Sequence, residues 1–117
     1  MTKAFDINNL NSLRDALRIF CAERQWQSFH TPKNLSMALI KEAAEIVEHF
    51  QWATAEESHE IDPEKKSAVA DEIADVLMYL VQLADVLDID PLAAAQEKIA
   101  KNAKKYPALR PSPDKRS

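Results

Sequence analysis

The chain has 117 residues, 46% of them hydrophobic and 29% charged, which is the length of one domain and the composition of a folded protein. It contains no glycine, which excludes glycine-rich phosphate-binding loops and dinucleotide-binding turns and leaves helices as the main option. Residues 1–100 hold 9 basic and 18 acidic side chains, against 6 and 1 in residues 101–117, and such an acidic body disfavours binding to a nucleic-acid polymer.

Apolar residues recur at helical spacing in four segments. A polar run without such spacing, TAEESHEID, separates the first two segments from the last two and indicates a loop. The first predicted helix spans residues 7–25. Its apolar stripe consists of Leu10, Leu13, Leu17 and Phe20. A connection containing Pro32 follows, because proline removes a hydrogen bond inside a helix, and Asn34 is the expected N-cap of a second helix over residues 35–53.

Two Asp-Pro pairs mark the starts of the last two predicted helices, since Asp is a good N-cap and proline is tolerated at the first helical position. Asp62 and Pro63 open a helix over residues 63–87, and Asp90 and Pro91 open one over residues 91–106. The proline-rich and polar end is expected to be a mobile tail at residues 108–117, after a single domain at residues 1–107.

The sequence also predicts the cellular setting. Cys21 is the single cysteine and cannot form an intramolecular disulfide, which favours a reducing compartment. The first residues do not resemble a secretion signal, and there is no apolar run of about 18 residues that would span a membrane. We expect a soluble, cytoplasmic protein without a membrane partner.

The third predicted helix is apolar on more than one side. One stripe consists of Val69, Ile73, Val76, Leu80 and Leu83, and further apolar residues lie outside it. A single copy with four helices can cover one such stripe but hardly two, so the surplus predicts an all-α, four-helix bundle that is completed by homo-oligomerisation.

Two pairs of acidic residues lie on the second and third predicted helices. Glu42 and Glu45 are three residues apart, as are Glu72 and Asp75, so each pair is adjacent on one helix surface. In each pair, the first residue lies about 60° and the second about 120° to the same side of the apolar stripe of its helix. An antiparallel packing of the two helices would therefore bring four carboxylates to one edge.

Four converging carboxylates repel one another unless a cation neutralises them. Oxygen ligands without thiol or imidazole suit Mg²⁺, or Mn²⁺ in its place, and Mg²⁺ commonly bridges to the phosphates of a substrate. The alternative, that these residues are ordinary solvated charges on helix surfaces, is equally compatible with the spacing.

These segments resemble a known family in their order along the chain: EAAEIVEHFQW, then EIADVLMYL, then KIAKNAKKYP. They are similar to the MazG-like, all-α nucleotide pyrophosphohydrolases, and most similar to the dCTP pyrophosphatase branch. The similarity runs from residue 24 to residue 107 and includes ERQWQSFHTPKNL. It implies hydrolysis of a nucleoside triphosphate, expected to be dCTP or a modified pyrimidine nucleotide, to the monophosphate and pyrophosphate.

The resemblance also implies roles for particular residues. It implies that the four carboxylates bind Mg²⁺, and Glu45 is the hypothetical general base that takes a proton from water. The expected phosphate-binding residues are Lys98, Asn102, Lys105 and, four residues after Asp75, Tyr79. The expected base-binding residues are Trp26, His30 and Trp52, because aromatic faces stack on planar bases.

Two positions depart from the family pattern. Ala44 replaces a common glycine but remains small enough for close helix packing. Leu17 occupies the position where cytosine-selective relatives have a histidine that reaches the base, and leucine cannot form hydrogen bonds. The sequence therefore leaves dUTP and other non-canonical nucleotides open as substrates.

Two alternatives remain beside the hydrolase. A non-catalytic helical module could bind nucleotides or partners through the same scaffold. A di-iron bundle would need two Glu-x-x-His motifs on core helices, and only Glu56 and His59 match, within a predicted loop. His49 is interpreted as a surface residue. The resemblance favours a homotetramer, a dimer of dimers, over a dimer.

Overall fold

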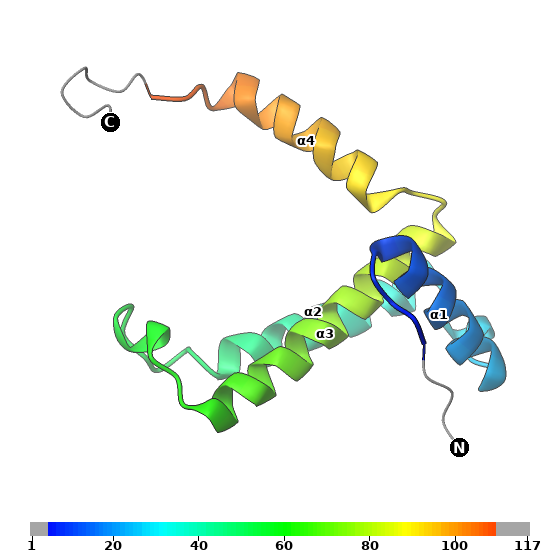
Figure 1. Cartoon of the computed structure of the whole chain (residues 1–117), viewed down its shortest axis with the longest axis horizontal. Coiled ribbons are helices and arrows are strands. Elements are labelled where there is room, and N and C mark those ends of the chain that lie inside the picture. Colours follow the sequence, from blue (N-terminus) through cyan, green and yellow to red (C-terminus); the bar gives the residue numbers. More distant parts are fainter. Residues whose placement is uncertain (1–4, 110–117) are drawn as a thin grey trace.

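The computed structural model describes residues 5–109, and this part of the chain contains four α-helices, two short 3-10 turns and no strand. The elements are α1 (Leu10–Glu23), η1 (Gln27–Phe29), α2 (Pro32–Glu48), η2 (Glu57–His59), α3 (Pro63–Val86) and α4 (Pro91–Lys105), as shown in Figure 1. The predicted all-α class with four helices is confirmed. The tail predicted at residues 108–117 lies outside the described residues from residue 110 onward.

Side-chain caps set the helix starts, and one of them corrects the prediction. The Asp62 and Asp90 carboxylates accept backbone hydrogen bonds at the starts of α3 and α4, as expected. At α2 the N-cap is Thr31, whose Oγ1 accepts from the Asn34 backbone at 3.2 Å, so the prediction of Asn34 as the cap is wrong. Pro32 lies inside the helix after all, because the first helical position needs no N–H donor.

Two helices end in a left-handed residue although the chain lacks glycine. Gln25 has φ 57° after α1, and Asp88 has φ 55° after α3. The backbone of the residue that follows each one donates back into the last turn: Trp26 to Cys21 at 3.0 Å and Ile89 to Ala84 at 2.8 Å. Both sites therefore carry a conformational cost that a glycine would not.

Replacement of Asp88 by glycine is expected to stabilise the protein by about 0.5–1 kcal/mol, because glycine adopts a positive φ without a steric penalty. Thermal or denaturant unfolding of the two chains measures this difference. Asp71, which is exposed in the middle of α3, provides the control, since glycine there should destabilise the helix. A lower stability of Asp88→Gly would contradict the strain at this turn.

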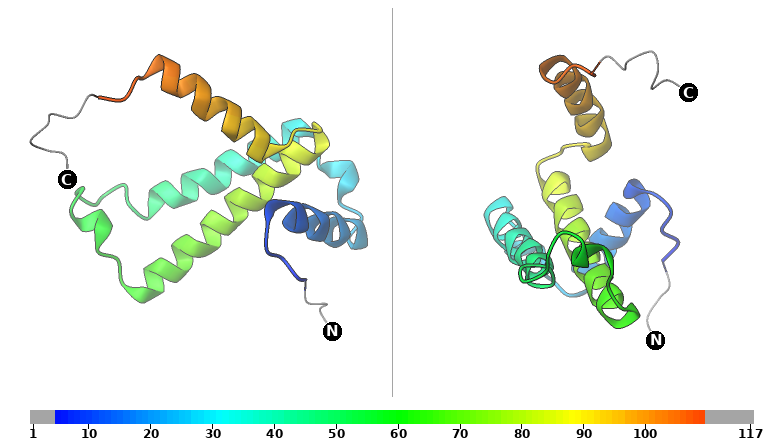
Figure 2. Two further views of the ribbon diagram at one scale, coloured as in Figure 1. Left: turned by 45° about the horizontal axis from the view of Figure 1, so that its top comes forward. Right: turned by 90° about the vertical axis from the view of Figure 1, so that its left-hand side faces the viewer.

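Helices α2 and α3 form an antiparallel hairpin that is closed at one end by residues 49–62 (Figures 1 and 2). At that end Lys65 Nζ lies 5.6 Å from the centre of the Phe50 ring. His49, at the end of α2, lies against Glu72 on α3. This antiparallel order is the arrangement that the two acidic pairs require to face each other.

Helix α1 packs on α3 away from α2, so α3 lies between the other two helices (Figure 2). Arg18 on α1 binds Asp85 on α3 through two hydrogen bonds, from Nε at 2.8 Å and from Nη2 at 2.6 Å. The guanidinium lowers the pKa of the Asp85 carboxyl, mainly through this hydrogen bonding. A paired carboxylate with two charge-assisted bonds fixes the position of α1 along α3.

Helix α4 leaves the other three helices and extends away from them (Figure 1). Every residue of α4 after Pro91 is exposed, including Leu92 and Ile99, and Ile99 has 70% of its surface accessible. The radius of gyration is 18.6 Å, against about 13 Å for a compact chain of this length. Four helices are present, but only three of them pack together within one chain.

The buried core is correspondingly small. It consists of Ala16, Leu17, Cys21, Leu35, Val69, Val81 and Ala84. Two members of the apolar stripe predicted on α3 remain open, Ile73 with 54% and Leu80 with 45% of their surface accessible. The stripe is therefore wider than one copy of the chain covers, because α4 does not fold back onto α3.

Candidate active site

Four half-buried carboxylates occupy the facing edges of α2 and α3. Glu42 and Glu45 lie on α2, and Glu72 and Asp75 lie on α3. Three other acidic side chains on these two helices, Glu48, Glu64 and Asp71, are exposed, and Asp85 is half-buried against Arg18 of α1. Half-burial of all four predicted metal ligands is unusual for plain solvated charges, because carboxylates lose hydration when covered.

Three of these carboxylates act on one another. The pKa of Glu42 is raised, first by burial, then by a hydrogen bond with Glu45 and by the negative charges of Glu45 and Asp75. Like charges at short range disfavour the ionised form of the Glu42 carboxyl. A cation placed among these groups would reverse the effect.

Glu72 has a different partner, His49, which the sequence analysis interpreted as a surface residue. His49 Nε2 lies 2.7 Å from Glu72 Oε2, and both side chains are mostly covered. The signal for this contact was in the spacing, because His49 follows Glu42 by seven residues and so shares its side of α2. His49 adds a titratable group beside a predicted metal ligand.

The buried oxygen of Glu72 tests whether a metal ion fits here. Oε2 accepts no hydrogen bond from any residue that the structure describes, although His49 Nε2 lies 2.7 Å away. A buried carboxylate oxygen without a donor is costly. Hard divalent cations take carboxylate oxygens, so the donor set fits Mg²⁺. Within residues 5–109, no three acidic, histidine or cysteine side chains already surround a single point at metal-binding distance.

Beside the carboxylates lies a cavity of about 250 Å³ between α1, η1 and α3, which we call the α1–α3 cavity. It is lined by Leu17, Phe20, Cys21, Trp26, His30, Asp75, Met78, Tyr79 and Gln82. The Trp26 ring centre lies 5.7 Å from that of Phe20 and 6.1 Å from that of His30. The cavity thus joins an aromatic wall to Asp75, one of the predicted metal ligands.

The structure brings together some predicted site residues and separates others. Trp26, His30 and Tyr79 share the α1–α3 cavity, but Trp52 lies beyond the opposite end of α2, with 89% of its surface accessible. The 17 residues of α2 place these two ends about 25 Å apart. Lys98, Asn102 and Lys105 are exposed on α4, which extends away from the carboxylates (Figure 1).

One polar residue of the cavity escaped the sequence analysis. Gln82 lies seven residues after Asp75 and therefore on the same side of α3. Its amide contacts Cys21 of α1, and the distance from Cys21 Sγ to Gln82 Oε1 is 3.3 Å. Burial raises the pKa of the Cys21 thiol. Leu17, the departure from the family pattern, is buried in the same wall.

Comparisons with known proteins agree on one family. Residues 38–112 match the model of the MazG-like family. The dCTP pyrophosphatase 1 of Bos taurus is 37% identical over 91% of this chain, and that of Homo sapiens is 40% identical over 83%. A crystal structure of a pyrophosphatase from Archaeoglobus fulgidus superposes with a TM-score of 0.81 at 41% identity, covering 92% of this chain and all of that one.

The lengths of these proteins differ. The matched region spans 66% of the bovine protein and 60% of the human protein, so the chain corresponds to about two thirds of these curated relatives. No helix among residues 5–109 combines the length and apolar character that a membrane crossing requires. The region that matches the family model includes both acidic pairs.

Proposed function

We propose that this chain, which belongs to the MazG-like family, is a Mg²⁺-dependent nucleoside triphosphate pyrophosphohydrolase acting on dCTP or on a modified or non-canonical pyrimidine nucleotide. The observation that carries the proposal is the position of Asp75. Its negative charge acts on Glu42 of α2, and its side chain also lines the α1–α3 cavity with Trp26 and His30. A nucleotide bound there would place its polyphosphate at the acidic edge and its base against the aromatic wall.

The residues proposed to hold the metal are Glu42, Glu45, Glu72 and Asp75, with Mn²⁺ as a substitute for Mg²⁺. When bound, the cation neutralises the polyphosphate and lowers the pKa of coordinated water. The support from this chain is the unsatisfied oxygen of Glu72 and the raised pKa of Glu42, both of which a cation would relieve.

Glu45 is the proposed general base. Its carboxylate is half-buried beside Glu42 on the face of α2 that meets α3. In the proposed step, a water oxygen forms a bond to phosphorus and its proton moves to a carboxylate oxygen of Glu45. The anhydride bond between the α and β phosphates breaks, and pyrophosphate leaves with the electron pair. Tyr79, four residues after Asp75 on the cavity wall, would bind the phosphates or the sugar.

A second copy of this chain is proposed to complete the molecule, with a tetramer built as a dimer of dimers. Helix α4 carries four lysines and one glutamate, whereas the α2–α3 hairpin is acidic. Its exposed apolar residues, Leu92 and Ile99, match the open apolar surface at Ile73 and Leu80 of α3. Lys98, Asn102 and Lys105 would then approach the carboxylates of another copy rather than their own, and bind phosphates there.

A substrate panel tests this function. The protein with Mg²⁺ is incubated with the canonical deoxynucleoside triphosphates, dUTP and modified pyrimidine triphosphates, and both pyrophosphate and orthophosphate are measured. We expect equimolar monophosphate and pyrophosphate from a pyrimidine nucleotide, and no turnover after chelation of the metal. Release of orthophosphate alone would contradict cleavage between the α and β phosphates.

A non-catalytic nucleotide-binding module would give a different result in the same panel. A nucleotide that binds only the folded state raises the melting temperature whether or not it is hydrolysed. If nucleotides raise the melting temperature but none of them releases pyrophosphate, the chain is a nucleotide-binding module and not an enzyme.

A further inference from the structure

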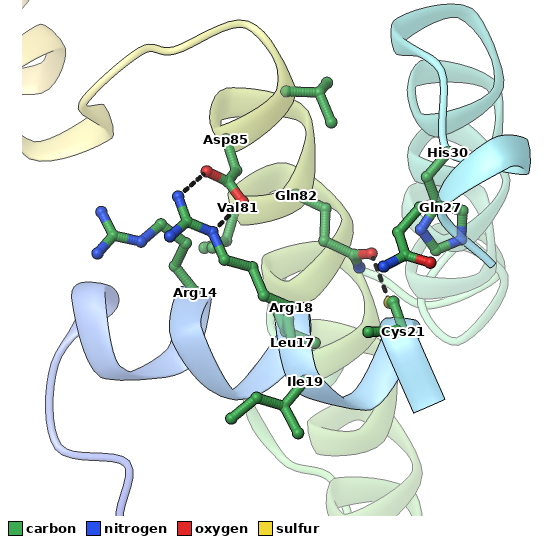
Figure 3. A pocket seen from close by; sticks show the side chains of 12 residues that line it. Arg14, Leu17, Arg18, Ile19, Cys21, Gln27, His30, Val81, Gln82 and Asp85 are labelled. Carbon is green, nitrogen blue, oxygen red and sulfur yellow. Dashed lines mark hydrogen bonds and ion pairs between the residues drawn. The ribbon is translucent and has the colours of Figure 1, made fainter. Parts of the chain in front are cut away.

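The wall of the α1–α3 cavity is apolar and aromatic on its α1 side, but α3 contributes one amide to it, that of Gln82. This cavity and a second one of about 460 Å³ meet at Leu17, Cys21, His30 and Gln82. Figure 3 shows the Gln82 side chain extending from α3 towards Cys21, with His30 and Gln27 beyond it. An amide at the junction of two cavities is reachable by a ligand in either of them.

Two contacts fix the orientation of this amide. Gln82 Nε2 donates to the Met78 backbone carbonyl at 3.1 Å. A carbonyl oxygen can only accept, so the nitrogen must be on that side and Oε1 must face Cys21. The Cys21 thiol, kept protonated by burial, donates to Oε1 at 3.3 Å. The side chain is thus held by a helix turn on one side and by α1 on the other.

These two contacts use only part of the hydrogen-bonding capacity of the amide. An amide can donate twice and accept twice, and in the described part of the chain Gln82 donates once and accepts once. The remaining N–H donor and oxygen lone pair lie next to each other. A pyrimidine presents a matching pair on its edge: an amino donor beside a ring acceptor in cytosine, and a ring N–H beside a carbonyl in uracil.

The distance along α3 suits a nucleotide. Gln82 and Asp75 are seven residues apart, about 10 Å along the helix axis, and both line the α1–α3 cavity. Phosphates near Asp75 would leave the base near Gln82, between Trp26 and Leu17. Leu17 has no hydrogen-bonding group, so this position of α1 offers the base no polar contact, whereas the Gln82 amide on the facing helix does.

We propose that Gln82 is the residue that reads the hydrogen-bonding edge of the pyrimidine, and that Cys21 is the positioning residue that holds its amide. This inference rests on the proposed function, since the base is that of the triphosphate substrate. Discrimination between pyrimidines then depends on one fixed amide, because a base with the wrong donor and acceptor order leaves that amide unpaired.

The test compares kcat/KM for dCTP and dUTP in the wild type, Gln82→Leu, Cys21→Ala and Cys21→Ser, and their ratio is the readout. Leucine keeps the volume of glutamine but removes the amide. We expect the ratio of kcat/KM for the preferred pyrimidine nucleotide to that for the other one to fall at least about tenfold in Gln82→Leu. Cys21→Ala should give a smaller change in the same direction, and Cys21→Ser, which keeps a donor, should restore the ratio. Gln51→Leu, in the exposed turn after α2 and outside both cavities, is the matched control.

A purely structural role for Gln82 would change stability or overall rate but not the ratio. An unchanged ratio in a folded Gln82→Leu protein, judged by circular dichroism, therefore overturns the inference while the proposed function stands. Calorimetric binding of the α,β-imido analogues of dCTP and dUTP to the same variants separates the two ideas further. The protein could bind the two bases with different affinity through Gln82 and yet hydrolyse no nucleotide. That result would support the inference about Gln82 and contradict the proposed hydrolase activity.

Discussion

Asp75→Asn is expected to reduce pyrophosphate release by roughly 10³-fold and to leave the helices intact. Asparagine keeps the shape of the side chain but removes the charge that is proposed to help hold the divalent cation. A metal ion contributes several kcal/mol to a transition state with developing charge, and each 1.36 kcal/mol corresponds to tenfold in rate. Asp75 is also the residue that links the acidic edge to the α1–α3 cavity. Initial rates at saturating Mg²⁺ measure the effect.

Asp71→Asn is the matched control for this substitution. Asp71 lies one turn earlier on α3 and is exposed, so the same chemical change there removes a surface charge only. We expect its turnover to remain within about twofold of the wild type. Equal turnover in Asp75→Asn and the wild type, with helical circular dichroism preserved in both, would show that the acidic edge is not the catalytic site.

Ile99→Asp is expected to dissociate the oligomer and to abolish activity with it. Ile99 is exposed on α4 within one chain, beside Leu92, on the face that a second copy is proposed to cover. A buried unpaired carboxylate costs several kcal/mol, enough to weaken the assembly by at least about 10²-fold. Activity should fall because the lysines of α4 would no longer reach any acidic hairpin. Size-exclusion chromatography with light scattering measures the mass of each species.

Lys101→Asp is the control for the interface, because Lys101 lies on the opposite side of α4 from Ile99 and the substitution changes the charge more. The control protein should keep the mass of the wild type. A wild type that is monomeric at micromolar concentration, or an Ile99→Asp protein with unchanged mass, would exclude the proposed role of α4 in assembly.

Local features of this fold follow directly from the sequence. The Asp62–Pro63 and Asp90–Pro91 pairs start α3 and α4 where expected, because capping depends on residues within one helical turn. The exception is α2, which is capped by Thr31 instead of Asn34. Both residues are good caps, and the choice between them was decided by how early proline can enter the helix.

The candidate site likewise has a part that the sequence predicted and a part that it did not. The spacing of Glu42 with Glu45 and of Glu72 with Asp75 predicted two pairs at one edge of facing helices, since residues three apart share a helix surface. The structure adds that all four side chains are half-buried. Their partners were not predictable. His49 contacts Glu72 across the hairpin, and the distance between two helices depends on their packing angle rather than on the spacing within either.

By itself, the sequence determined four helices, the N-terminal caps of α3 and α4, the acidic pairs and the surplus of apolar surface on α3, because each depends on neighbours within a few residues. Only the tertiary structure decided that α4 stands apart, that Trp52 lies far from Trp26 and His30, and that Gln82 meets Cys21. These features join residues far apart in the chain, and their positions follow from how α1, α2 and α3 pack and from an apolar face that one copy cannot bury.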